Sequence, residues 1–307
     1  MVILIILKKL IDSIHIKYYG YLIIITMSEK RHYLNYLLIN VHNYKFKDWQ
    51  EYFPDGKIKL DGLCINEDWG EFFDKTKEIQ TEIEEKLTKR FLTNKKFVPY
   101  PELIFNSFNV VSPKKIKVII LGQDPYINMK EFDGINIPEA MGLSFSVPYG
   151  YPRPPSLYNI YANLVKFGHL KEMPHEGCLI GWVMQGCLMI NSAFTTIWKK
   201  SFEHKEIWPD FTEQLIEYIN ENCKNVAILA WGKPAHGLCC NIDHKKHKVI
   251  YSSHPSPYSY TITVNGWRPD QGYVAHPSFQ ETDHFGEANK YLLSVDKTPI
   301  LWDVIDI

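Results

Sequence analysis

The stretch KVIILGQDPYINMK, residues 117–130, determines how the middle of the chain folds. Its four apolar residues, 118–121, predict a buried strand, because an unalternating apolar run is typical of a strand covered on both faces. The strand runs directly into GQDPY, residues 122–126, where a glycine and a proline stiffen the turn. The turn carries an amide, a carboxylate and an aromatic ring, so it is suited to aim side chains at a ligand.

Four apolar runs of this kind alternate with helical patterns, and together they predict the fold class. The strands are expected at 116–121, 187–191, 226–231 and 248–252, and the helices at 154–167, 208–223 and 234–242. Short apolar strands separated by helices indicate a parallel sheet with helices on both faces. We therefore expect an α/β protein, a three-layer α/β/α sandwich around a short four-stranded parallel sheet.

The residues that follow these strands are polar and chemically varied. Asp124 follows the first strand, Asn191 ends the second, Lys233 follows the third and His254 follows the fourth. Parallel strands bring their carboxyl ends to one edge of the sheet, where open α/β folds bind their ligands. An Asp, an Asn and a His from distant parts of the sequence are therefore expected in one cleft.

Composition narrows the classes of function. The 307 residues are 45% hydrophobic and 22% charged, with a formal net charge of −1, so a substantial core is expected and any nucleic acid must be held by local patches. The six cysteines form no CxxC pair, which favours reduced thiols and argues against an iron–sulfur cluster. The string HGLCCNIDHKKH, 236–247, admits a metal site, but its spacing is not a standard zinc pattern. The sequence contains neither a GxGxxG nor a GxxxxGKS motif, and this absence argues against a nucleotide cofactor.

The N-terminal part of the chain divides into an extension and the start of the domain. Residues 1–30 hold two apolar bursts interrupted by charges, which fits neither a spanning helix nor a signal peptide. We assign residues 1–44 to an extension of unknown role and 45–307 to a single catalytic domain. The pattern at 66–92 predicts one long amphipathic helix capped by Asn66.

The motifs at the strand ends resemble those of the family 1 uracil-DNA glycosylases. The residues GQDPYI, 122–127, match the water-activating motif GQDPYH of that family, except that Ile127 stands in place of the final histidine. The residues HPSPYS, 254–259, match the motif HPSPLS, except that Tyr258 stands in place of the leucine. Between them, in the order of the family, lie GLSFSVP (142–148), PPSLYNIYANL (154–164), QGCLMINSAFT (185–195), HKE (204–206) and AILAWGKPAHG (227–237). The resemblance covers residues 45–303 and implies a monofunctional uracil-DNA glycosylase that flips the base and starts base-excision repair.

Cleavage of an N-glycosidic bond places positive charge on the deoxyribose and negative charge on the leaving base. On the matched positions, the catalytic residues are Asp124, which supplies an anion and orients the water, and His254, which in its neutral form donates to uracil O2. Backbone groups around Gln123 add donors. No metal or cofactor is required.

The uracil-binding residues implied by the match are Gln123, Tyr126, Phe145 and Asn191. The Asn191 amide offers an acceptor and a donor that suit the N3–H and O4 edge of uracil but not cytosine. Phe145 stacks on the base, and Tyr126 leaves no room for the methyl group of thymine.

The positions that lie near the DNA phosphates in this family correspond to Ser156, Lys233 and Ser256. We expect a nearby loop to add contacts from His204 and Lys205. Tyr258 replaces the leucine that wedges into the duplex, so flipping is expected with an altered preference between single- and double-stranded DNA. Ile127 replaces a phosphate-contacting histidine. Two insertions, 128–140 and 261–280, flank the DNA face as extra contacts or a partner surface.

We expect a monomer that binds uracil-containing single- or double-stranded DNA inside the cell, in a nucleus or at a viral or cytoplasmic replication site. It is expected neither to be secreted nor to bind a membrane. The abundance of Ile, Lys and Asn fits an AT-rich genome, such as that of a large DNA virus. Two other functions stay open: a binding module that contacts a replication or repair protein, and a glycosylase for mismatches or other lesions.

Overall fold

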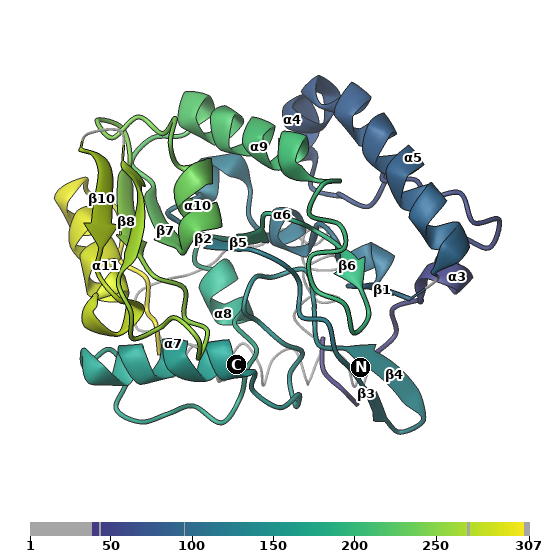
Figure 1. Ribbon diagram of the computed structural model, residues 1–307, viewed down its shortest axis with the longest axis horizontal. Helices are drawn as coiled ribbons and strands as arrows, with labels where there is room; N and C mark the ends of the chain where they lie inside the picture. Colours follow the sequence, from purple (N-terminus) through teal and green to yellow (C-terminus); the bar gives the residue numbers. More distant parts are fainter. Residues whose placement is uncertain (1–38, 43, 95, 269–270, 304–307) are drawn as a thin grey trace, which may run out of the picture. The chain divides into compact units, whose positions relative to one another are not determined.

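A central sheet of four parallel strands organises the protein, in the order β5–β2–β7–β8 (Figure 1). The strands are β2 (Val118–Gly122), β5 (Cys187–Asn191), β7 (Ala227–Trp231) and β8 (Lys248–Ser252). In the register, Val118 lies opposite Cys187 on one side and Ala227 on the other. The predicted parallel sheet is confirmed, and each strand lies within two residues of its expected limits.

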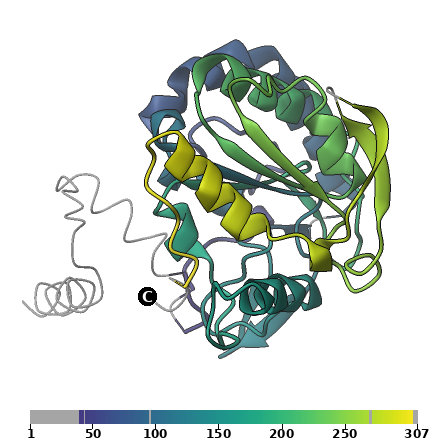
Figure 2. The same cartoon turned by 90° about the vertical axis from the view of Figure 1, so that its left-hand side faces the viewer.

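Helices cover both faces of this sheet, so the predicted three-layer sandwich is also confirmed. Helix α11 packs on β7 and β8, and α8 packs on β5 beside it, with the rings of Trp182 and Phe285 5.8 Å apart. Helix α10 packs on β7 and touches α9 on the opposite face (Figures 1 and 2). The helices are α3 (Trp49–Tyr52), α4 (Gly70–Lys75), α5 (Lys77–Thr93), α6 (Asn106–Val110), α7 (Pro155–Lys166), α8 (Ile180–Val183), α9 (Pro209–Asn222), α10 (Lys233–Leu238) and α11 (His284–Ser294).

This computed structural model describes residues 39–42, 44–94, 96–268 and 271–303. The compact unit begins at Ile39, earlier than the boundary at residue 44 drawn from the sequence. Ile39 and Val41 are buried, and the backbone N–H of Val41 donates to the carbonyl of Tyr149 at 3.0 Å. Residues 1–38 and 43 of the predicted extension lie outside the described residues. Among the described helices, none is both long and apolar enough to cross a membrane.

The segment 66–92 is not one helix, and this part of the prediction is wrong. A 3₁₀ turn over Glu67–Trp69 leads into α4, and α5 begins after a break at Thr76. The Thr76 hydroxyl donates to the Phe72 carbonyl at 2.9 Å, and such a local hydrogen bond competes with a regular helix. The predicted cap is confirmed, because the Asn66 side chain accepts the N–H of Asp68.

Both insertions form antiparallel hairpins. The first is β3 (Met129–Phe132) with β4 (Ile135–Pro138), and the second is β9 (Val264–Arg268) with β10 (Gly272–His276). A short antiparallel pair joins β1 (Phe97–Val98), which follows α5 in the chain, to β6 (Thr196–Ile197), which follows β5. All six cysteines, which fall among the described residues, are free thiols.

Candidate active site

The carboxyl ends of β2 and β5 bring two predicted residues together. Gly122 lies opposite Asn191 in the sheet register, and Gln123 and Asp124 follow directly. A Cβ at position 122 would stand 2.0 Å from Asn191 Oδ1 and 2.9 Å from Ser144 Cβ. Glycine is therefore required at this strand end, because any side chain would displace the Asn191 amide.

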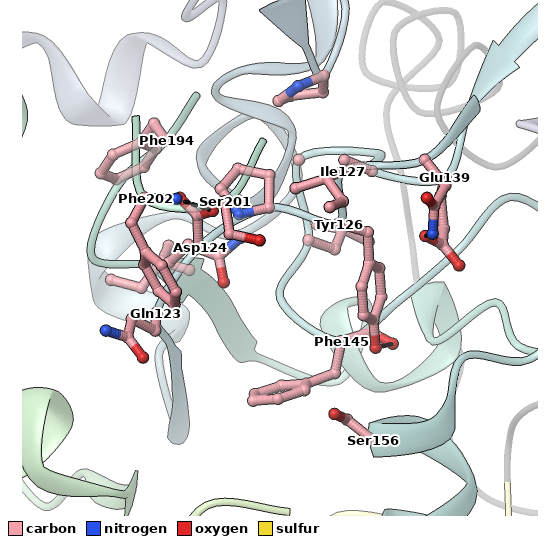
Figure 3. Close-up of a pocket in the computed structure, with 18 of the residues that line it drawn as sticks. Gln123, Asp124, Tyr126, Ile127, Glu139, Phe145, Ser156, Phe194, Ser201 and Phe202 are labelled. Atoms are coloured by element: carbon pink, nitrogen blue, oxygen red, sulfur yellow. Dashed lines mark hydrogen bonds between the residues drawn. The ribbon is translucent and has the colours of Figure 1, made fainter. Parts of the chain in front are cut away.

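A cavity of about 310 Å³ opens at this edge of the sheet. Figure 3 shows side chains from several strand ends and loops pointing into one space. Eight of the ten residues predicted from the sequence line it: Gln123, Asp124, Tyr126, Phe145, Ser156, Asn191, His254 and Ser256. The other two lie outside the lining: Lys233 is exposed at the start of α10, and Tyr258 is 95% exposed.

The Asp124 carboxylate is held at one oxygen and unpartnered at the other. The backbone N–H of Phe202 donates to Oδ2 at 2.9 Å. Oδ1 is buried and has no hydrogen-bond partner in the part of the chain that the structure describes. Burial raises the pKa of Asp124 to about 6, although the hydrogen bond from the Phe202 N–H opposes the rise. At neutral pH the group is an anion that can accept a proton from a water molecule.

His254 is arranged as a neutral hydrogen-bond donor. Its Nδ1 accepts the backbone N–H of Ser256 at 3.0 Å, so the proton of the neutral ring sits on Nε2. Burial lowers the pKa of His254 to about 4, and the ring is therefore uncharged at neutral pH. An Asp anion and a neutral His donor in one cavity can stabilise separated charges without neutralising each other.

Phe145 gives the cavity a flat aromatic wall. Its ring lies 5.3 Å from the ring of Trp231 and 5.6 Å from that of His254, measured between centroids. Its backbone adopts φ +62°, a left-handed conformation that is costly for a bulky residue and persists where the surroundings impose it. The Tyr126 hydroxyl donates to the Phe145 carbonyl at 3.2 Å, which ties the two rings into one unit.

The residues predicted to contact DNA phosphates differ in where they lie. Ser156 stands in the first turn of α7 and lines the cavity. Ser256 also lines the cavity, and its hydroxyl lies 2.9 Å from that of Ser259. The suggestion that His204 contacts DNA is wrong, because this side chain is fully buried and its Nδ1 pairs with the Thr195 hydroxyl at 2.9 Å.

Part of the rim was not predicted from the sequence. Asn128 and Glu139, from the β3–β4 insertion, line the cavity, and the Asn128 amide donates to Glu139 Oε2 at 3.0 Å. Ser201 and Phe202 line it beside Asp124. They precede the HKE motif, and no pattern in their residue types marks them as part of a site. Among the described residues, no three His, Cys, Asp or Glu side chains are grouped so that they could hold a metal ion.

Comparisons with known proteins agree with the motifs. The model of the uracil DNA glycosylase superfamily matches residues 108–271. A protein of Acanthamoeba polyphaga mimivirus named a probable uracil-DNA glycosylase is 47% identical over 273 residues, which cover 88% of this chain and 73% of that protein. A uracil-DNA glycosylase of Campylobacter concisus is 37% identical over 252 residues, covering 81% and 98%. The crystal structure of the mimivirus enzyme matches with a TM-score of 0.83 and 46% identity over 88% of this chain and 98% of that one.

Proposed function

Because this chain belongs to the uracil DNA glycosylase superfamily, we propose that it hydrolyses the N-glycosidic bond of deoxyuridine in DNA and so starts base-excision repair. The observation that carries this function is that Asp124 and His254 line the same cavity. One is an anion with a buried free oxygen, and the other is a neutral donor. These are the two groups that a bond breaking into a sugar cation and a base anion requires.

The reaction follows from this placement. As the bond between C1′ and N1 breaks, its electron pair leaves with uracil, and the His254 Nε2–H donates to the oxygen at C2 where the negative charge gathers. Asp124 stabilises the sugar cation and holds the water that attacks C1′. The water oxygen forms the new bond to C1′ and Asp124 accepts its proton. The uracil anion takes a proton at N1 from solvent as it is released, and Asp124 returns its proton to solvent. The products are free uracil and an abasic site.

Recognition of uracil rests on the deep end of the cavity. Phe145 stacks on the flipped base, and stacking of a base on an aromatic ring contributes about 1–3 kcal/mol. The Asn191 side chain reads N3–H and O4, and the Gln123 backbone borders the base. Tyr126 occupies the space next to C5, where thymine carries its methyl group.

DNA is held at the cavity mouth. Ser156 lies at the positive end of the α7 dipole, and Ser256 adds a hydroxyl from the HPSPYS loop. Lys233 reaches a phosphate from the start of α10. Tyr258, a ring left 95% exposed beside the cavity, fills the gap in the duplex when the base leaves it.

Because the proposed substrate is uracil-containing DNA, we expect the protein to act inside cells, in a nucleus or at a viral or cytoplasmic replication site. We expect it to act as a monomer, since the groups that the chemistry requires come from one chain. A replication or repair partner stays a prediction, for which a pull-down on the same active preparation is the measurement.

The test is release of uracil from single- and double-stranded oligonucleotides, with and without EDTA. We expect equal release in both conditions and none from thymine-containing controls of the same sequence. No release from either strand form, with the protein folded, would overturn the proposed function.

A further inference from the structure

The cavity rim beside Asp124 is built by Ser201 and Phe202, in the connection from β6 to α9. Phe202 lines the cavity, yet it is 47% exposed. Figure 3 shows Phe202 next to Asp124 and Gln123, with Phe145 lower in the same space. Single exposed apolar side chains are common on protein surfaces, so what singles out Phe202 is its place in the cavity lining together with its hydrogen bond to Asp124.

The backbone of Phe202 is strained in a way that serves Asp124. Its φ of +62° lies in the left-handed region, which a bulky residue occupies at a cost of roughly 1–3 kcal/mol. In this conformation the Phe202 N–H donates to Asp124 Oδ2 at 2.9 Å.

Neighbouring hydrogen bonds fix the segment around Phe202. The Lys199 N–H donates to the Ile127 carbonyl at 2.8 Å, and the Thr196 hydroxyl donates to the Lys200 carbonyl at 2.9 Å. The segment is therefore tied to the turn that carries the catalytic carboxylate.

The position of the ring identifies its contact. In the proposed function the base lies between Asn191 and the buried Phe145, and the sugar attached to it lies next to Asp124. Phe202 lines the cavity beside Asp124 (Figure 3) and donates its N–H to that carboxylate, so its ring is on the side of the sugar.

On the premise of the proposed function, we propose that Phe202 contacts the deoxyribose of the flipped nucleotide and shields Asp124 from bulk water, while its N–H positions the carboxylate. An aromatic face attracts the positive charge that develops on the sugar. Exclusion of water strengthens the attraction between that charge and Asp124. No motif of the sequence assigns this role to Phe202.

Three variants separate the ring from the backbone. In Phe202→Ala the contact and the shield are lost, and we expect kcat to fall about tenfold. Phe202→Gly also relieves the left-handed strain, and we expect it to be as slow as Phe202→Ala, because the ring is absent in both. Phe202→Leu keeps an apolar cover but loses the aromatic face, so its kcat should lie between those of Phe202→Ala and the wild type. Leu293→Ala, which removes another exposed apolar side chain on the distant α11, is the matched control.

The pH profile distinguishes shielding from a loss of fold. Burial raises the pKa of Asp124, so hydration in Phe202→Ala should lower it and move the acid limb of kcat/KM to lower pH. A ¹³C titration of the Asp124 carboxyl group in the free protein should show the same shift without substrate. An unchanged kcat, or an unchanged Asp124 titration, in a folded Phe202→Ala would overturn the inference.

Failure of this inference and failure of the proposed function give different results. If the wild-type protein releases uracil and Phe202→Ala does so equally well, the role of Phe202 falls and the function stands. If the wild-type protein releases no uracil, the function falls, and the sugar contact of Phe202 falls with it.

Discussion

The interior of the cavity and its rim are built in different ways. Asp124, Asn191 and His254 follow strands of one parallel sheet, whose register fixes their relative positions. The rim comes from the β3–β4 hairpin and from the 199–203 segment, where Lys199 and Phe202 both have a positive φ. The interior can therefore hold the chemistry to a narrow geometry, while the rim can change without altering the sheet. We expect substitutions in the interior to reduce kcat and those at the rim to change KM, with Phe202 as the exception because it touches both.

The largest effect should come from Asp124→Asn. The amide keeps the size of the carboxylate and its oxygen can still accept the Phe202 N–H, but the negative charge and the base are lost. We expect kcat to fall about 10³-fold, within the range for loss of a general base. DNA binding, measured by fluorescence anisotropy, should stay within about twofold of the wild type. Unchanged single-turnover release would remove Asp124 from the mechanism.

Gly122→Ala tests the interior without removing a polar group. The new methyl group would stand 2.0 Å from Asn191 Oδ1, so the amide must move, and a displacement of about 1 Å can cost roughly a hundredfold in rate. We expect kcat/KM on uracil-containing DNA to fall by about that factor. Gly70→Ala is the control, because nothing lies within 4 Å of its added Cβ in α4. Wild-type kcat/KM in Gly122→Ala would show that the interior is less rigid than the register implies.

The pH dependence should report Asp124 alone. Burial raises its pKa to about 6, and the proposed mechanism uses the charged form, so we expect activity to be lost as the pH falls through 6. The proposed mechanism also uses a neutral His254, and because burial lowers the pKa of His254 to about 4, it remains neutral at pH 5. We expect kcat/KM to fall about tenfold from pH 7 to pH 5, measured at constant ionic strength. An acid limb centred near pH 4 would mean that Asp124 is better hydrated than its burial indicates.

The difference between the interior of the cavity and its rim explains which residues could be predicted from the sequence. Unalternating apolar runs predicted the four strands, and the carboxyl-end rule then placed Asp124, Asn191 and His254 together. The motif match supplied Phe145 and Ser156, whose cavity positions the strand pattern alone does not determine. Phe202 was missed because its position depends on a positive φ and on hydrogen bonds that its segment donates to distant residues, which leave no periodic signal. His204 was misjudged for a similar reason, since the same residue type can be buried or exposed in a loop.

Ile127→His tests the rim and should have the smallest effect. The Ile127 carbonyl already accepts the Lys199 N–H, so the backbone should hold whichever side chain is present. A histidine here can add one hydrogen bond to a DNA phosphate, which would lower KM about threefold with little change in kcat. Ile127→Ala is the control for loss of the apolar side chain, and KM is measured on double-stranded substrate. A change in kcat instead would show that position 127 affects the chemical step, as the interior residues do. A change confined to KM would mean that the rim holds DNA and that the residues at the strand ends set the rate.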